Sequence, residues 1–164
     1  MTSAEYPVLF FYVPPNRGQS LELALVDLTN KKQKYQLAYS NPKTPGIVSV
    51  DLSKIKNLPV LEVGKNYHWY FSIVCDTQNR SQNEVVDGFV QRVKLDPTLE
   101  QDIQKASQRD RISIYFINNL WYDSIGTLAQ LRQASPNDSS LVDEWANLLG
   151  GIGLDSIARE PLIY

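Results

Sequence analysis

One segment constrains the fold of this chain more than any other, the run from Asn66 to Cys75. Tyr67, Trp69, Phe71 and Ile73 recur at every second position along it, with more polar residues between them. Side chains of a β-strand point alternately to the two faces of a sheet, so this spacing places the apolar residues on one face. We therefore expect a long strand with that face, including Trp69 and Phe71, packed in a hydrophobic core.

The residues that lead into this strand carry a second constraint. Leu61, Gly64 and Tyr67 have the Leu-x-x-Gly-x-x-Tyr spacing of a tyrosine corner, in which the tyrosine hydroxyl ties the corner to nearby backbone. This corner is typical of immunoglobulin-like and fibronectin-like β-sandwiches. The alternative is an ordinary turn before an aromatic strand. The corner predicts that the Tyr67 hydroxyl bonds to backbone a few residues upstream.

Short apolar or alternating runs between turn residues fill the rest of residues 1–95, which is the pattern of antiparallel sheets. The expected strands are residues 6–13, 20–28, 35–39, 47–52, 66–75 and 85–93, with a polar turn at 29–32. The first of them ends at Pro14 and Pro15, which indicates an edge strand because proline cannot donate to a ladder. Both faces of that strand are apolar, so we expect it to be buried on both sides.

Beyond residue 95 the pattern changes from strands to helices. Asp96 and Pro97 form a helix start, and a later helix is expected from Trp121 to Ala134. Ser140, with Asp143 three residues on, indicates the start of a further helix that ends at Gly150 and Gly151. The predicted class is therefore α+β, with an antiparallel immunoglobulin/fibronectin-like β-sandwich domain in residues 1–95. An α-helical segment packed on the sandwich follows in residues 96–164.

The helical segment resembles part of a tetratricopeptide array. The positions that fit one hairpin of that repeat are Tyr115, Asn119, Trp121, Ser124, Leu128 and Pro136, although the early Trp and Gly of the repeat are absent. Such units need about three neighbours to be stable alone, and the segment holds at most one repeat and part of another. We therefore expect the helices to pack on the sandwich rather than to form a superhelical groove.

Composition excludes several functional classes. The net charge of −2 offers no basic footprint for a phosphate backbone, so nucleic acid is not an expected partner. One cysteine, Cys75, and one histidine, His68, allow neither an intrachain disulfide nor a zinc cluster, and no metal or cofactor is expected. No apolar run reaches the length of a transmembrane segment, and the first residues lack the pattern of a signal peptide. Either the protein is cytoplasmic, or the chain starts after a removed leader.

The candidate binding site is the polar loop that joins the two clearest strands. Its candidate residues are Asp76, Arg80, Ser81 and Asn83, and sandwich domains place binding residues on such loops. The alternative is that these side chains tie the loop to itself or to the helices. Tyr70 and other aromatics on the same face as His68 could form a sugar-binding platform, but we expect the helices to cover them.

No residue is expected to be catalytic. The chain has no nucleophile elbow, phosphate loop or dinucleotide fingerprint. His68 lacks an orienting carboxylate at the spacing of a known motif and is expected to be a sheet residue. Cys75 is in phase with the core and is expected to be a buried thiol.

Several stretches together resemble a bacterial, chiefly cyanobacterial, family called domain of unknown function 928. They are Thr44 to Ser49, Leu61 to Cys75, Arg80 to Asn83 with Gly88 and Gln91 to Val93, Trp121 to Asp123 with Leu128 to Arg132, and Trp145 to Leu162. The resemblance spans nearly the whole chain and implies no activity, since the family has none assigned. Its members often look exported, with a leader before the sandwich, which implies a periplasmic or otherwise exported protein.

Two functions follow as hypotheses. The first is a non-enzymatic binding or protein-interaction module that acts outside the cytoplasm, with another protein as its partner. The second is an enzyme with an unfamiliar site built on carboxylates such as Glu62, Asp76, Glu84 and Asp87, which show no recognisable acid-pair pattern. The absence of catalytic motifs favours the first, although a fold does not decide function.

Overall fold

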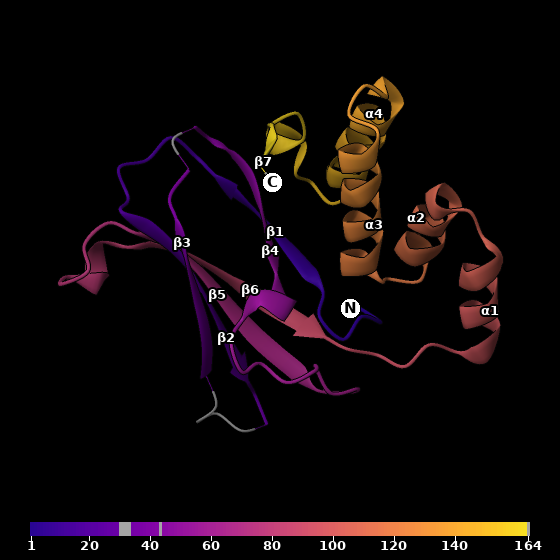
Figure 1. The fold of residues 1–164 in the computed structure, drawn as a ribbon, viewed down its shortest axis with the longest axis horizontal. Coiled ribbons are helices and arrows are strands. Elements are labelled where there is room, and N and C mark those ends of the chain that lie inside the picture. The colour runs from indigo at the N-terminus through magenta and orange to yellow at the C-terminus, as the bar shows by residue number, and fades with distance from the viewer. Residues whose placement is uncertain (30–33, 43, 164) are drawn as a thin grey trace.

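The computed structural model describes residues 1–29, 34–42 and 44–163. Figure 1 shows a mixed α+β fold, which confirms the α+β part of the predicted class. The strands are β1 (Val8–Val13), β2 (Ser20–Asp27), β3 (Lys34–Ser40), β4 (Gly46–Asp51), β5 (Asn66–Val74), β6 (Glu84–Gln91) and β7 (Leu162–Ile163). The helices are α1 (Pro97–Lys105), α2 (Gln108–Ile117), α3 (Trp121–Ala134) and α4 (Ser139–Gly150), with short 3₁₀ turns η1 (Leu52–Lys54), η2 (Arg80–Gln82) and η3 (Asp155–Ile157). The turn expected at 29–32 lies largely outside the described residues.

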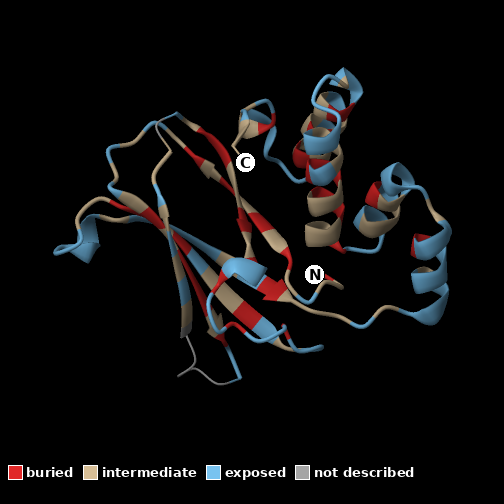
Figure 2. Cartoon of the chain, in the orientation of Figure 1, coloured by how far each residue is buried: buried red, intermediate tan, exposed pale blue. Residues whose placement is uncertain are grey.

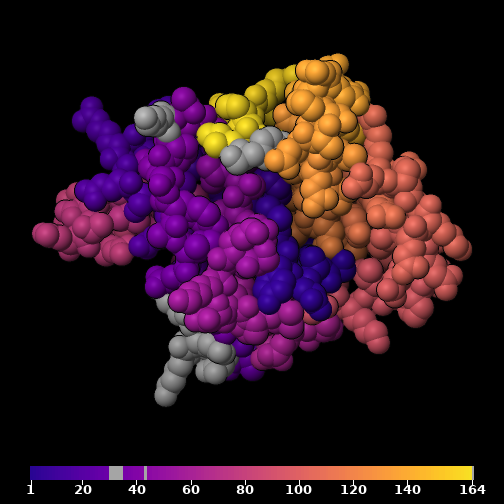
Figure 3. Space-filling model, in the orientation of Figure 1, coloured from indigo at the N-terminus to yellow at the C-terminus, as the bar shows by residue number. Residues whose placement is uncertain are grey.

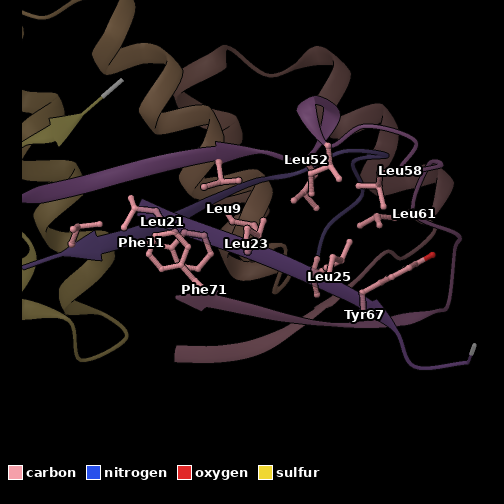
Figure 4. Packing of buried hydrophobic residues seen from close by; sticks show 14 of the residues in the cluster. Leu9, Phe11, Leu21, Leu23, Leu25, Leu52, Leu58, Leu61, Tyr67 and Phe71 are labelled. Atoms are coloured by element: carbon pink, nitrogen blue, oxygen red, sulfur yellow. The ribbon is translucent and has the colours of Figure 1, made fainter. Parts of the chain in front are cut away.

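The strands of the described residues form two sheets with a shared core between them. One sheet has the order β3-β2-β5-β6 and the other β1-β4-β7, so β1 is an edge strand as its prolines indicate. Figure 4 shows side chains from both sheets meeting in this core. Its buried members are Leu9, Phe11, Val13, Leu21, Leu23, Leu25, Val50, Leu52, Ile55, Leu58, Leu61, Tyr67, Phe71, Ile73 and Val90. The alternation in β5 thus buries the face that its sequence predicts, and Phe71 stacks on Phe11 with ring centroids 4.1 Å apart.

The hydrogen bond that the tyrosine corner predicts is present. The backbone N–H of Glu62, five residues upstream, donates to the Tyr67 hydroxyl at 3.0 Å, as predicted. Gly64 lies between them with φ of +84°, a left-handed conformation that costs glycine little. Tyr67 is itself buried, so its polar tip has a partner while its ring fills the core.

Replacing Tyr67 with phenylalanine should therefore lower the free energy of unfolding by about 1 kcal/mol, because the Glu62 N–H loses its acceptor while the ring stays in place. Denaturant unfolding of the two proteins measures the difference. An unchanged midpoint and slope would show that the bond contributes nothing to the corner.

Trp69 differs from the expectation of a fully buried core residue. It is only partly buried at the margin of the core, where its ring covers Gly88 on the neighbouring strand. A Cβ atom at Gly88 would collide with that ring, so only glycine leaves room for the indole at this position. Trp69 still contacts the smaller sheet, because its ring meets Phe11 of β1 edge-on with ring centroids 5.2 Å apart. Cys75, expected to be buried, is likewise only half-buried, at the end of β5.

A second hydrophobic cluster joins the helices to the outer face of the β1-β4-β7 sheet. Its buried members are Ile47, Ile112, Ile125, Leu128, Ala129, Leu141, Trp145, Leu149 and Ala158, with Phe10 and Tyr12 packed against them. Strand β1 therefore has Leu9, Phe11 and Val13 in one cluster and Phe10 and Tyr12 in the other. In Figure 2 the buried side of α3 faces the sheets, whereas α1, farthest from them, is mostly exposed.

Polar bonds fasten the start of α3 to the sheets. The Tyr122 hydroxyl donates to the Phe89 carbonyl oxygen at 2.7 Å and accepts from Trp69 Nε1 at 3.2 Å. Next to it, Asp123 accepts from the Ser3 N–H at 3.0 Å and from the Ser3 hydroxyl at 2.5 Å. Burial raises the pKa of Tyr122, so the hydroxyl stays neutral and able to donate. Figure 3 shows the N-terminal residues, in indigo, against the helices.

Local hydrogen bonds set the starts of α2 and α4, and the start of α4 differs from the sequence expectation. The segment around Arg109 begins a separate helix, α2, because Ser107 caps it by accepting from the Asp110 N–H at 3.1 Å. Helix α4 starts at Ser139, and its cap is Asp138 rather than Ser140. Asp138 accepts from the Ser140 N–H at 3.0 Å and the Ser140 hydroxyl, which lower the pKa of Asp138. Helix α3 begins and ends as predicted.

The chain returns to the smaller sheet at its end, which its sequence pattern did not indicate. Strand β7 lies parallel to β4, with Ile47 opposite Leu162 and Val48 opposite Ile163. Gly46 allows this approach, because a Cβ there would meet the Pro161 carbonyl oxygen and the Ile163 side chain. The four helices of the described residues are thus held between a strand of each sheet, β6 before them and β7 after them.

Candidate functional site

The predicted loop, residues 76–83, projects from the end of the sheets away from the helices (Figure 1). Three of its four candidate residues make local hydrogen bonds. Asp76 accepts from the Gln78 N–H at 2.7 Å, Ser81 donates its hydroxyl to Asn79 at 2.6 Å, and Asn83 accepts from the Cys75 N–H at 3.1 Å. These bonds shape the loop and leave its backbone ordered around η2.

Arg80, the fourth candidate, reaches from the loop to the sheet. Its guanidinium donates to both carboxylate oxygens of Glu22 on β2, at 2.7 and 3.1 Å. This two-point geometry fixes the plane of the guanidinium, and the carboxylate raises the pKa of Arg80. The Arg80 side chain is 55% exposed and that of Glu22 24% exposed, so the pair is solvent-accessible and contributes little to stability, but it aligns the loop with one face of the larger sheet.

That face is the most distinctive uncovered surface of the described residues. We call it the open face and define it by six side chains: Glu22, His68, Tyr70, Arg80, Asp87 and Phe89. The β5–β6 register puts His68 opposite Phe89 and Tyr70 opposite Asp87, so these four project on the same side. Phe89 is 58% exposed and Tyr70 36% exposed. The expectation that the helices cover Tyr70 is wrong, because they pack on the other sheet.

His68 organises the centre of the open face. Its Nε2 lies 2.6 Å from an Asp87 carboxylate oxygen, and its Nδ1 lies 2.9 Å from the Tyr70 hydroxyl. The imidazole also stacks on Phe89, with ring centroids 4.3 Å apart, and lies 4.2 Å from the Tyr70 ring. Both ring nitrogens are therefore engaged, and the imidazole holds the two aromatic rings and the carboxylate in fixed positions.

A shallow hollow of about 560 Å³ adjoins this aromatic centre. Small side chains of β2, Ala24 and Val26, make its floor, and Tyr70 forms one wall. Gln36, Ser72 and the Glu22–Arg80 pair add hydrogen-bonding groups around it. The open face thus combines exposed rings, a small-residue hollow and polar groups at its margin.

The sequence alone indicated only part of this site. It singled out Arg80 in the loop and noted Tyr70, but it missed Glu22, Asp87 and Phe89 as parts of one surface. The alternation of Val85, Asp87 and Phe89 along β6 was the available indication, since it marks one face of a strand. His68 has a carboxylate partner that no motif spacing marks, because the sheet register supplies Asp87 from 19 residues away.

Other classes of site were sought in the part of the chain that the structure describes. It contains no cluster of three or more His, Cys, Asp or Glu side chains that could hold a metal ion. No helix in these same residues has the length and apolarity needed to cross a bilayer.

Comparison with known proteins gave one finding. A search among curated proteins gave no match, and a search among solved structures gave none either. The model of one family, described as Domain of Unknown Function (DUF928), matches residues 1–162 of the 164-residue chain. The matched region includes strands β1 to β6, the first residue of β7, helices α1 to α4 and every residue of the open face. The chain therefore belongs to the family called domain of unknown function 928.

Proposed function

We propose that this chain is a non-enzymatic binding module that acts outside the cytoplasm and binds another protein through its open face. The observation that carries the proposal is the pair of rings, Tyr70 and Phe89, that stand exposed and locked by His68 on an uncovered sheet. Ordering these rings in advance reduces the entropy lost on binding. The exported location rests on the resemblance to a family whose members often carry a leader.

The composition of the open face suits a protein partner. Tyr, Phe and Arg are enriched in the centres of protein interfaces, where a few such residues dominate the binding energy. Here the rings and His68 lie at the centre, and the Glu22–Arg80 ion pair and the Asp87 carboxylate lie beside them. Charges at a rim select the partner and its orientation more than they add affinity.

The fold-level part of the proposal is an immunoglobulin-like sandwich that carries a tetratricopeptide-like hairpin. The Tyr67 bond and the shared core of two sheets support the first. For the second, Ser124 is fully buried in α3 and donates its hydroxyl to the Ile112 carbonyl of α2 at 2.9 Å. Asn119, with φ of 60°, makes the turn between these helices.

The enzymatic alternative has one supporting observation, the Asp87–His68–Tyr70 chain of hydrogen bonds. The order carboxylate, imidazole, hydroxyl resembles a catalytic relay, but the hydroxyl belongs to a tyrosine rather than to a serine nucleophile, and the imidazole is stacked on Phe89. We therefore assign His68 the role of positioning the rings.

Site-specific photocrosslinking in the cells of origin tests the proposed surface. A photoreactive phenylalanine analogue at Phe89 should give a discrete protein adduct, and the same analogue at Ile117 should not. Ile117 is a suitable control because it is 74% exposed but lies on α2, away from the larger sheet. With the partner in hand, Tyr70→Ala should weaken binding by roughly tenfold or more, as for a central interface ring.

Three outcomes would oppose the proposal. Equal adducts from both positions would show non-specific contact, and no adduct from Phe89 would leave the open face without a protein partner. Retention of the chain on glycans, lost in Tyr70→Ala, would make a sugar the ligand of this surface.

A further inference from the structure

A cavity lies between the smaller sheet and the helices, on the other side of the molecule's core from the open face. It measures about 220 Å³ and is lined by β1 and β4 on one side and by α3, α4 and the segment up to η3 on the other. For comparison, an apolar cavity of about 150 Å³ can stay dry and bind benzene. The space is therefore large enough for a ring compound.

The lining determines what the cavity could hold. None of its side chains is charged, and its aromatic members are Phe10, Phe11, Tyr12, Trp69, Trp121, Tyr122 and Trp145. A charged molecule would lose its hydration there without gaining an opposite charge, which is costly. The Trp69 N–H is committed to the Tyr122 hydroxyl, and that hydroxyl to the Phe89 carbonyl oxygen. Trp145 Nε1 in the same lining is buried without a hydrogen-bond partner among the described residues, so a largely apolar ligand could still accept one hydrogen bond there.

The cavity also has an apolar opening. Ile152 and Leu154, between α4 and η3, belong to its lining and are 46% and 38% exposed. Backbone bonds from both residues to the Leu149 carbonyl, at 3.1 and 3.0 Å, hold this segment beside the cavity. A small molecule could therefore enter past these side chains without separation of the helices from the sheet.

We propose that this cavity binds a small, uncharged, largely apolar ring compound. The site shares no residue with the open face, so the proposal is independent of the protein-binding function. A ligand in this cavity would stabilise the packing of the helices on the smaller sheet, because a ligand that binds only the folded chain shifts the equilibrium toward the folded state.

The chain carries its own reporter for this site, since all three of its tryptophans line the cavity. Toluene is a suitable probe, and benzoate, similar in shape but charged, is its matched control. Toluene should change the tryptophan fluorescence saturably and raise the melting temperature of the full chain. Benzoate should need a concentration roughly tenfold or more higher for any similar effect.

Two variants locate the effect. Ile125→Phe adds volume inside the cavity and should abolish the saturable change, whereas Val85→Phe makes a similar enlargement on the larger sheet and should leave it intact. If Ile125→Phe fails to fold, Ile152→Phe at the half-exposed opening serves instead and should weaken toluene binding. A fluorescence change that is linear in toluene, equal for benzoate, or unaffected by both cavity variants would overturn the proposal.

Discussion

Replacing Trp145 with alanine should lower the free energy of unfolding by about 3–5 kcal/mol, the range for large aromatic side chains lost from a core. Trp145 is 1% exposed and lies at the centre of the helical cluster. Its ring meets Phe10 of β1 edge-on, with centroids 5.6 Å apart, and the guanidinium carbon of Arg132 lies 5.2 Å from its ring centroid. The substitution therefore removes contacts to the sheet as well as within the helices.

Denaturant unfolding followed by far-ultraviolet circular dichroism measures this loss. Ile117→Ala is the control, since that side chain is exposed on α2 and its removal should change stability by no more than about 0.5 kcal/mol. A loss below about 1 kcal/mol for Trp145→Ala would mean that the cluster does not hold the helices to the sheet.

A chain shortened to end at Val93 should lose its cooperative melting transition. Without the helices and β7, the outer face of the smaller sheet exposes Phe10, Tyr12 and Ile47 to water. Strand β4 also loses its partner on one side, and unpaired apolar edges promote aggregation. The expected product is insoluble or partly unfolded and binds a hydrophobic dye, as seen by light scattering and dye fluorescence.

A rescue experiment separates the exposed face from other causes of failure. Threonine at Phe10, Tyr12 and Ile47 in the shortened chain should improve its solubility, because it removes the apolar surface and keeps β-branched or strand-compatible side chains. A sharp melting transition for the shortened chain without these changes would show that residues 1–93 fold alone.

Local patterns in the sequence predicted the parts of the fold that local interactions decide. The spacing of Leu61, Gly64 and Tyr67 is a property of one turn, and its hydrogen bond is present as expected. The period of β5 and the bounds of α3 followed from side-chain repeats within single elements. The sequence left open whether the first helix continues past Arg109 or restarts there, because Ser107 and Asp110 lie inside a polar run that suits either.

The open face could not be predicted in the same way, because strand pairing creates it. His68 meets Asp87 only through the register of β5 with β6, and that register depends on the conformation of residues 76–83. Arg80 meets Glu22 across 58 residues, a contact that requires β2 to pair with β5. A shift of one residue in either pairing would send these side chains to opposite faces of the sheet.

The parallel pairing of β7 with β4 means that the smaller sheet can be completed only at the end of synthesis. Strand β4 pairs with β1 as soon as residues 8–51 are available, but its other edge stays open until Leu162 and Ile163 have been made. More than a hundred residues therefore leave the ribosome after Asp51 while that edge of β4 remains unpaired. Long-range closure of this kind slows folding and prolongs exposure to aggregation, so the nascent chain is a natural client for chaperones.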